Sequence, residues 1–248
     1  MNTPYAALVS SDWNECLAPC GPFDVIGFHF PELAPKVEAI FRLYTTHAIP
    51  LGSAIDEVAR LLPEPIGLER MDAYLRSAFA TYRGVAELMA MCREQGILFM
   101  INTTGLRGYF QRAVALRLLP PPAALSAHPL IAYAEGPGAG PFYPLLEIAD
   151  KARNTAAAAA HFKIPPQKIV LMGDSGGDGP HFQWGARVGA RLIGCMVKAS
   201  LGDYCRRAGI ALHHYFGPVY AAGEPKDPRR EAGCDFRDLF EIVAKALE

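Results

Sequence analysis

Short apolar segments alternate with segments of helical periodicity along most of this 248-residue chain. The clearest apolar segments are residues 97–101 (ILFMI), 168–172 (KIVLM) and 190–197 (ARLIGCMV). A strand with one face in water alternates apolar and polar residues, whereas a strand buried on both faces is apolar throughout. The alternation therefore predicts an α/β fold with a Rossmann-like parallel sheet, covered by helices on both faces.

The same patterns locate the other elements of the core. Further strands are expected at residues 6–10, 129–134 and 212–216, and helices at 85–96, 109–119, 150–162, 181–189, 202–209 and 235–248. Asp235 is the expected N-cap of the last helix, because its side chain can accept hydrogen bonds from the first free backbone amides. Two polar segments that follow strands, 102–105 (NTTG) and 173–178 (GDSGGD), are interpreted as turns.

Residues 32–82 show a different pattern, with helical periodicity and no strand signal. Breaks with the sequences IPLG and PEPIG divide this stretch into separate helices. We therefore expect a small α-helical cap domain inserted into the core. The predicted core comprises residues 1–17 and 84–248, and the predicted cap comprises residues 18–83.

Composition limits the partners of the chain. The formal net charge is −1 and the basic residues are scattered, so no nucleic acid and no membrane surface is expected as a partner. The longest apolar segments are far too short to span a bilayer. The first residues, MNTPYAALVSSDW, lack the pattern of a signal peptide, and the six cysteines include no Cys-x-x-Cys pair. We expect a cytoplasmic protein with reduced thiols.

The sequence GDSGG, which includes Ser175, is similar to the nucleophile loop of a chymotrypsin-like protease. Such a protease needs an all-β double barrel and a His and an Asp upstream of its Ser, in that order. Here Asp150 precedes His161, and Ser175 follows a strand of a predicted parallel sheet. We therefore set the protease hypothesis aside and interpret Asp174 and Asp178 as paired carboxylates placed to hold a metal ion.

Polar groups follow several of the predicted strands. They lie in the sequences SDWN (11–14), NTTG and GDSGGD, with Lys151 on an intervening helix. Because ligands bind beyond the carboxyl ends of the strands in an open parallel sheet, we expect these groups in one cluster. Carboxylates without a nearby His or Cys suit a hard cation, best Mg²⁺. Mg²⁺, a lysine and a threonine hydroxyl neutralise a phosphoryl group, and a nearby aspartate can attack it.

The order of these four motifs resembles that of the haloacid dehalogenase superfamily of hydrolases. ALVSSDWNECL resembles its first motif, ILFMINTTG its second, Lys151 its third and IVLMGDSGGD its fourth. The helical stretch lies where that superfamily often inserts a cap, and the branch with phosphoserine phosphatase is the most similar in shape. The resemblance implies a Mg²⁺-dependent phosphatase-type hydrolase that acts on a small organic phosphate through an aspartyl-phosphate intermediate.

The resemblance also implies a role for each motif residue. Asp12 would be the nucleophile, and Lys151 would neutralise Asp12 and the transferred group. Thr103 would donate a hydrogen bond to the phosphoryl oxygens, and the amides of Thr104 and Gly105 would add donors. One of the two threonine side chains is expected to face the site, and the register of the segment decides which. The residues that would bind Mg²⁺, directly or through water, are Asp12, Asn14 by its backbone carbonyl, Asp174 and Asp178.

Asn14 departs from the superfamily, whose phosphatases usually have a second aspartate there as the acid and base of the reaction. An amide cannot exchange a proton in this way, and general acid–base catalysis is worth roughly 10²–10⁴ in rate. Glu15 is next in the chain, but in an extended segment its side chain points elsewhere.

Three functions therefore stay open. The first is a phosphatase with altered acid–base chemistry, or with an activated substrate such as an acyl phosphate. The second is a superfamily member with other chemistry, such as C–P or C–halogen cleavage. The third is a non-catalytic phosphoryl-binding protein that keeps the fold.

Overall fold

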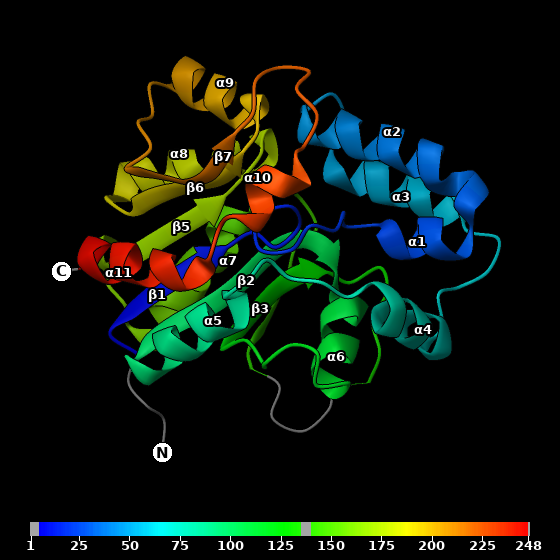
Figure 1. Cartoon of the computed structure of the whole chain (residues 1–248), viewed down its shortest axis with the longest axis horizontal. Coiled ribbons are helices and arrows are strands. Elements are labelled where there is room, and N and C mark those ends of the chain that lie inside the picture. Colours follow the sequence, from blue (N-terminus) through cyan, green and yellow to red (C-terminus); the bar gives the residue numbers. More distant parts are fainter. Residues whose placement is uncertain (1–4, 135–139, 248) are drawn as a thin grey trace.

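The computed structural model describes residues 5–134 and 140–247. Its centre is a seven-stranded parallel sheet in the order β4-β3-β2-β1-β5-β6-β7, so β1 is the central strand (Figure 1). The strands are β1 (Ala7–Ser11), β2 (Ile97–Leu106), β3 (Ala124–His128), β4 (Phe142–Pro144), β5 (Ile169–Gly173), β6 (Arg191–Val197) and β7 (His214–Val219). This topology confirms the predicted α/β fold with a Rossmann-like parallel sheet.

Successive strand residues enter two separate apolar cores. Val9 lies in the core that includes side chains of α5, α6 and α11, whereas its neighbour Leu8 lies in the core that includes side chains of α7, α8 and α9. Strands buried on both faces in this way explain the apolar segments of the sequence. The helices are α5 (Val85–Glu94), α6 (Arg107–Ala115), α7 (Asp150–Phe162), α8 (Gly179–Val188), α9 (Ala199–Ala208), the short α10 (Pro228–Ala232) and α11 (Phe236–Ala246). No helix in the described part of the chain is long and apolar enough to cross a membrane.

Four helices lie between β1 and α5 along the chain, and we call them the helical insertion (Figure 1). They are α1 (Asp24–His29), α2 (Ala34–Thr45), α3 (Leu51–Leu61) and α4 (Leu68–Ala78). α4 is fastened to α6 by a bidentate ion pair, in which Arg112 donates to the two Asp72 oxygens at 2.7 and 2.9 Å. The assignment of residues 18–83 to a separate cap domain stays a prediction.

Residues 102–105 (NTTG) do not form the turn that their composition predicts. β2 continues through them as far as Leu106, and Asn102 is fully buried. The Asn102 amide donates to Ser10 Oγ at 3.1 Å, to Thr155 Oγ1 at 2.9 Å and to the Lys151 carbonyl at 2.9 Å. These partners satisfy the side-chain nitrogen of Asn102, whose buried Oδ1 has no hydrogen-bond partner among the described residues, and a segment with the composition of a loop continues as a strand.

The prediction of a strand at 129–134 (PLIAYA) is wrong. The strands of this region are β3 and β4, which lie before and after that segment in the chain. His128 Nδ1 accepts a hydrogen bond from Leu130 N at 3.0 Å, and Gly108 N donates to Ile131 O at 2.7 Å. The backbone therefore makes its hydrogen bonds in a turn and with α6. The segment is apolar because Ile131 is buried in the core beside α6, and not because it joins the sheet. α10 was not predicted.

Candidate functional site

Three carboxylates meet at the carboxyl ends of the central strands. Asp12 follows β1, Asp174 follows β5, and Asp178 ends the short 3₁₀ turn before α8. One oxygen from each lies within 4.8 Å of the others, and all three residues are buried. The sheet order places β2 on one side of β1 and β5 on the other, so the direction of strand order changes here. Open α/β sheets bind their ligands at such a point.

Lys151 joins two of these carboxylates. It is the second residue of α7 and only 2% exposed, and its Nζ lies 3.1 Å from Asp12 Oδ2 and 2.6 Å from Asp178 Oδ1. Burial lowers the pKa of the ammonium group, but the two carboxylates raise it more, so the net pKa is above the ordinary value. Lys151 is therefore a fixed positive charge beside Asp12, and this is the position in which the motif resemblance placed it.

The carboxylate cluster fits a hard divalent cation. Burial raises the pKa of Asp12 to about 6 and that of Asp174 to about 7, and repulsion from Asp178 adds to both rises. The Asp174 Oδ2 atom is buried, and the Lys198 ammonium group lies 2.8 Å from it. Buried, mutually repelling carboxylates suit Mg²⁺, which prefers oxygen ligands. The side chains that would hold it are Asp12, Asp174 and Asp178.

These raised pKa values predict how stability depends on pH. Between about pH 4 and 7 the folded state binds protons at Asp12 and Asp174 more tightly than the unfolded chain does, so both carboxylates lower the free energy of unfolding as pH rises. Carboxylates in ion pairs, such as Asp235, have lowered pKa values and raise the free energy of unfolding as pH rises. The effect of Asp174 is therefore isolated by comparing the wild type with a variant that lacks this carboxylate. In EDTA, the free energy of unfolding measured with urea should fall less with rising pH, or rise more, for Asp174→Asn than for the wild type. Saturating Mg²⁺ should reduce this difference, and identical pH profiles in EDTA would contradict the prediction.

The two threonines of the second motif have different positions. The Thr103 hydroxyl donates to Asn14 Oδ1 at 2.9 Å and accepts from Gly105 N at 3.0 Å, so Thr103 and the Gly105 amide already bond within the protein. The Thr104 hydroxyl instead lines the cavity and lies 3.0 Å from Tyr44 Oη of α2. Adjacent strand residues point to opposite sides, and here Thr104 faces the site. The role predicted for Thr103 therefore suits the Thr104 hydroxyl better.

Asn14 is held by both ends of its side-chain amide. Its Oδ1 accepts from Thr103, and its Nδ2 donates to the Cys20 carbonyl at 3.2 Å. The amide therefore has the two partners that match its acceptor and its donor. A carboxylate at this position would have no hydrogen to donate to Cys20.

Three charged residues near the carboxylates were missed or misplaced by sequence reasoning. Glu15 has a left-handed backbone (φ 60°), which turns its side chain into the cavity instead of away from it. Its carboxylate pairs with Lys198 and, at 3.0 Å, with Lys226. Lys198 Nζ also lies 2.8 Å from Asp174 Oδ2. Lys198 follows β6 directly, so the rule that found Asp12 and Asp174 after their strands also applies to it.

The cavity at this site is small and is covered by the helical insertion. Its volume is about 20 Å³, and Phe41, Tyr44 and Thr45 of α2 line it together with the core residues. His47 Nε2 lies 2.9 Å from the Gly176 carbonyl, which ties the end of α2 to the turn after β5. This volume holds about one water molecule. A phosphoryl group is larger, so α2 or side chains that line the cavity must move to admit one.

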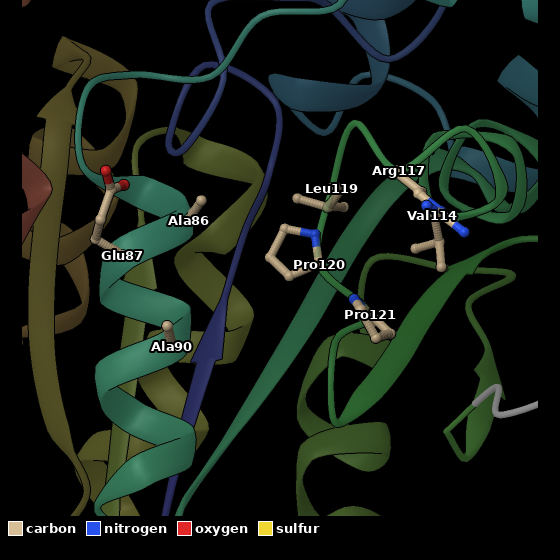
Figure 2. Close-up of a pocket in the computed structure, with 8 residues that line it drawn as sticks. All are labelled: Ala86, Glu87, Ala90, Val114, Arg117, Leu119, Pro120 and Pro121. Atoms are coloured by element: carbon tan, nitrogen blue, oxygen red, sulfur yellow. The ribbon is translucent and has the colours of Figure 1, made fainter.

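A more spacious hollow lies between α5 and the connection from α6 to β3 (Figure 2). Its volume is about 480 Å³, and Glu87 and Arg117 are the charged residues of its lining. The rest of the lining is Ala86, Ala90, Val114, Leu119, Pro120 and Pro121. These groups offer no nucleophile and no set of metal ligands. We therefore place the candidate site at the carboxylate cluster, although its cavity is smaller.

Comparison with solved structures agrees with this fold. No protein-family model matches the chain, and no curated protein matches its sequence. The fold is similar to that of solved phosphoserine phosphatases and of a haloacid dehalogenase (HAD) family hydrolase, in agreement with the fold that the resemblance of the motifs implied. Similar structures include a substrate-bound phosphoserine phosphatase (TM-score 0.68, 14% identity, 95% of this chain and 97% of that one) and a phospho-aspartyl intermediate analogue of phosphoserine phosphatase (TM-score 0.66, 14% identity, 96% and 99%). A HAD family hydrolase from Salmonella enterica serovar Typhi is also similar (TM-score 0.59, 15% identity, 86% of this chain and 67% of that one). At these identities the similarity establishes the fold.

Proposed function

We propose that this chain is a Mg²⁺-dependent phosphatase-type hydrolase that acts on a small organic phosphate through an aspartyl-phosphate intermediate. The observation that carries the proposal is the position of Asp12, which lies beside Lys151 and within one carboxylate cluster with Asp174 and Asp178. When bound by these carboxylates and the Asn14 backbone carbonyl, Mg²⁺ would neutralise negative charge on the phosphoryl oxygens. Because α2 covers the cavity, a small substrate is favoured over a large one.

The chemistry assigned to the residues has two steps. An Asp12 carboxylate oxygen attacks phosphorus, and the new O–P bond forms as the bond to the leaving oxygen of the substrate breaks. Lys151 stabilises the negative charge on Asp12 and on the transferred group, and the Thr104 hydroxyl can donate to a phosphoryl oxygen. Water then attacks phosphorus as the bond between Asp12 and phosphorus breaks, which restores the Asp12 carboxylate and releases inorganic phosphate that carries both protons of the water.

The proposed mechanism has no residue that protonates the leaving group, which restricts the substrates it can hydrolyse. The Asn14 amide does not titrate, and burial is outweighed at Glu15 by Lys198 and Lys226, which lower the pKa of that carboxyl. The pKa of Lys198 is raised by Asp174 and Glu15 against the effect of burial, so it is a poor acid at neutral pH. The cavity therefore favours a leaving group that needs no proton, such as that of an acyl phosphate.

Hydrolysis of acetyl phosphate and p-nitrophenyl phosphate by the pure protein tests the proposal. We expect turnover of both with Mg²⁺ and a loss of roughly 10²-fold or more in EDTA, because the buried carboxylates alone repel a phosphate ester. A simple alkyl phosphate should be hydrolysed much more slowly than either. Turnover that is equal with and without Mg²⁺ would contradict the metal-dependent mechanism.

A second candidate function is phosphoryl binding without turnover. It is favoured by the hydrogen bonds that hold Asn14 to Thr103 and Cys20, because they keep a group without acid–base chemistry at the site. In that case inorganic phosphate with Mg²⁺ should raise Tm, while neither activated ester is hydrolysed. Hydrolysis that is lost on replacement of Asp12 would exclude this second candidate.

A further inference from the structure

We propose that Lys198 competes with the divalent cation for Asp174, and that Glu15 is the carboxylate that receives Lys198 when the cation binds. Lys198 is then a positioning residue that sets the metal affinity of the site. This inference rests on the metal site of the proposed function. It concerns binding, so it can be tested without any substrate.

The contacts of Lys198 are the first observation. Its Nζ lies 2.8 Å from Asp174 Oδ2, a buried carboxylate oxygen. Asp174 is one of the three residues whose oxygens cluster within 4.8 Å. An ammonium group this close to the oxygen takes up negative charge that a metal ion at Asp174 would otherwise use. The backbone N of Lys198 donates to Asp174 O at 2.8 Å, so the lysine is fixed beside its partner.

Glu15 provides the second observation. Its carboxylate contacts the same Lys198 Nζ, so the ammonium group lies between two carboxylates from different segments of the core. Glu15 reaches this position only because its backbone adopts a left-handed conformation with φ 60°. That conformation is uncommon for a residue with a side chain, and it concentrates at functional sites. It directs a carboxylate toward Lys198 that the extended chain would direct elsewhere.

The charges around the cluster give the third observation. They are the carboxylates Asp12, Glu15, Asp174 and Asp178 and the ammonium groups Lys151, Lys198 and Lys226. A divalent cation held by the metal-site carboxylates would be close to both Lys151 and Lys198. Those carboxylates are Asp12, Asp174 and Asp178. Lys151 is 2% exposed and held by two partners, so it cannot leave. Lys198 has a side chain that is 25% exposed, which leaves room for its ammonium group to move away from Asp174 while it keeps its contact with Glu15.

The competition predicts opposite effects of two neutralising substitutions. Lys198→Met removes the competing charge and should tighten divalent-cation binding by at least about tenfold, because like charges a few ångströms apart repel strongly in a buried site. Glu15→Gln removes the alternative partner, so Lys198 should stay on Asp174 and cation binding should weaken. Lys226→Met is the matched control, because Lys226 also contacts Glu15 (3.0 Å) but has no contact with Asp174 among the described ion pairs.

The experiment titrates each full-length variant with Mn²⁺ and measures free Mn²⁺ by electron paramagnetic resonance, without substrate. The expected order of Kd is Lys198→Met lowest, Lys226→Met near the wild type, and Glu15→Gln highest. A Kd for Lys198→Met equal to or above that of the wild type overturns the inference, and so does a Glu15→Gln variant that binds more tightly. Lys198→Gln, a neutral residue of polar character, replaces the Met variant if that variant does not fold.

The result is separable from the proposed function. If the wild type binds Mn²⁺ and the order of Kd is as expected but no phosphate ester is hydrolysed, the competition stands and the phosphatase assignment fails. If esters are hydrolysed with Mg²⁺ and Lys198→Met binds Mn²⁺ no more tightly, only the competition fails. Loss of Mn²⁺ binding in Asp174→Asn shows that the measured ion lies at the carboxylate cluster. Binding that persists in Asp174→Asn overturns the inference.

Discussion

Replacing Asp12 by asparagine should lower kcat for Mg²⁺-dependent hydrolysis of p-nitrophenyl phosphate by roughly 10³-fold or more, because an amide oxygen is too weak a nucleophile to attack phosphorus. The substitution nearly preserves the shape of the side chain. The asparagine Oδ1 can still accept from Trp13 N, as Asp12 Oδ1 does at 2.7 Å. A folded variant is therefore expected, and its Tm and initial rates are measured together.

Asp24→Asn is a suitable control for this substitution. Burial also raises the pKa of Asp24, and its carboxylate accepts from Gly21 N at 2.7 Å. Asp24 does not line the cavity at Asp12, so its replacement should leave kcat near that of the wild type. If Asp12→Asn is folded and keeps a large fraction of the wild-type kcat, Asp12 is not the nucleophile.

Asp12 is assigned both to the nucleophile and to the metal site, so a second measurement must separate the two roles. Beryllium fluoride mimics a phosphoryl group attached to an aspartate. With Mg²⁺ it should raise the Tm of the wild type and leave that of Asp12→Asn unchanged. Mn²⁺ titration of the same variant reports the metal site alone. Retained Mn²⁺ binding without the beryllium fluoride effect assigns the lost rate to the nucleophile.

The core of the fold was predictable because its signals are local. Residues 150–162 were predicted as a helix, and α7 spans Asp150–Phe162. Asp235 was predicted as an N-cap, and its side chain accepts from Arg237 N at the start of α11. The apolar strands were visible because burial on both faces removes polar residues from them. Periodicity and capping act over a few residues, so one sequence contains them in full.

The errors arose where tertiary contacts decide the local structure. Asn102 and Thr104 look like loop residues, but buried partners from β1 and α7 keep Asn102 inside the sheet. Glu15 follows a strand, so alternation predicts an outward side chain, and its left-handed backbone reverses this. Nothing in the neighbouring sequence marks that reversal. The ordered motifs therefore located the carboxylate cluster, while the second layer of charges that Glu15 forms with Lys198 and Lys226 required the structure.

Replacing Asn14 by aspartate should increase kcat for a simple alkyl phosphate by roughly 10²-fold or more, because it supplies the missing general acid. In the wild type, Nδ2 donates to the Cys20 carbonyl at 3.2 Å and Oδ1 accepts from Thr103. A carboxylate oxygen in place of Nδ2 would face the carbonyl oxygen, and two acceptors repel unless one carries a proton. The contact therefore favours the protonated form of the introduced carboxyl group, which can donate to a leaving oxygen.

The gain should depend on the leaving group, because a good leaving group needs no proton. Acetyl phosphate hydrolysis should change little in Asn14→Asp, and the rate across a series of phosphate esters should fall less steeply with leaving-group pKa than in the wild type. Asn14→Ala is the control, because it also loses the contacts to Thr103 and Cys20 but supplies no acid. Its kcat should not increase for any of the esters. If the Asn14→Asp variant folds and binds Mn²⁺ but its kcat does not increase for any alkyl phosphate, proton donation at this position does not limit turnover. The preference for activated leaving groups would then need another cause, such as exclusion of larger esters by the small cavity under α2.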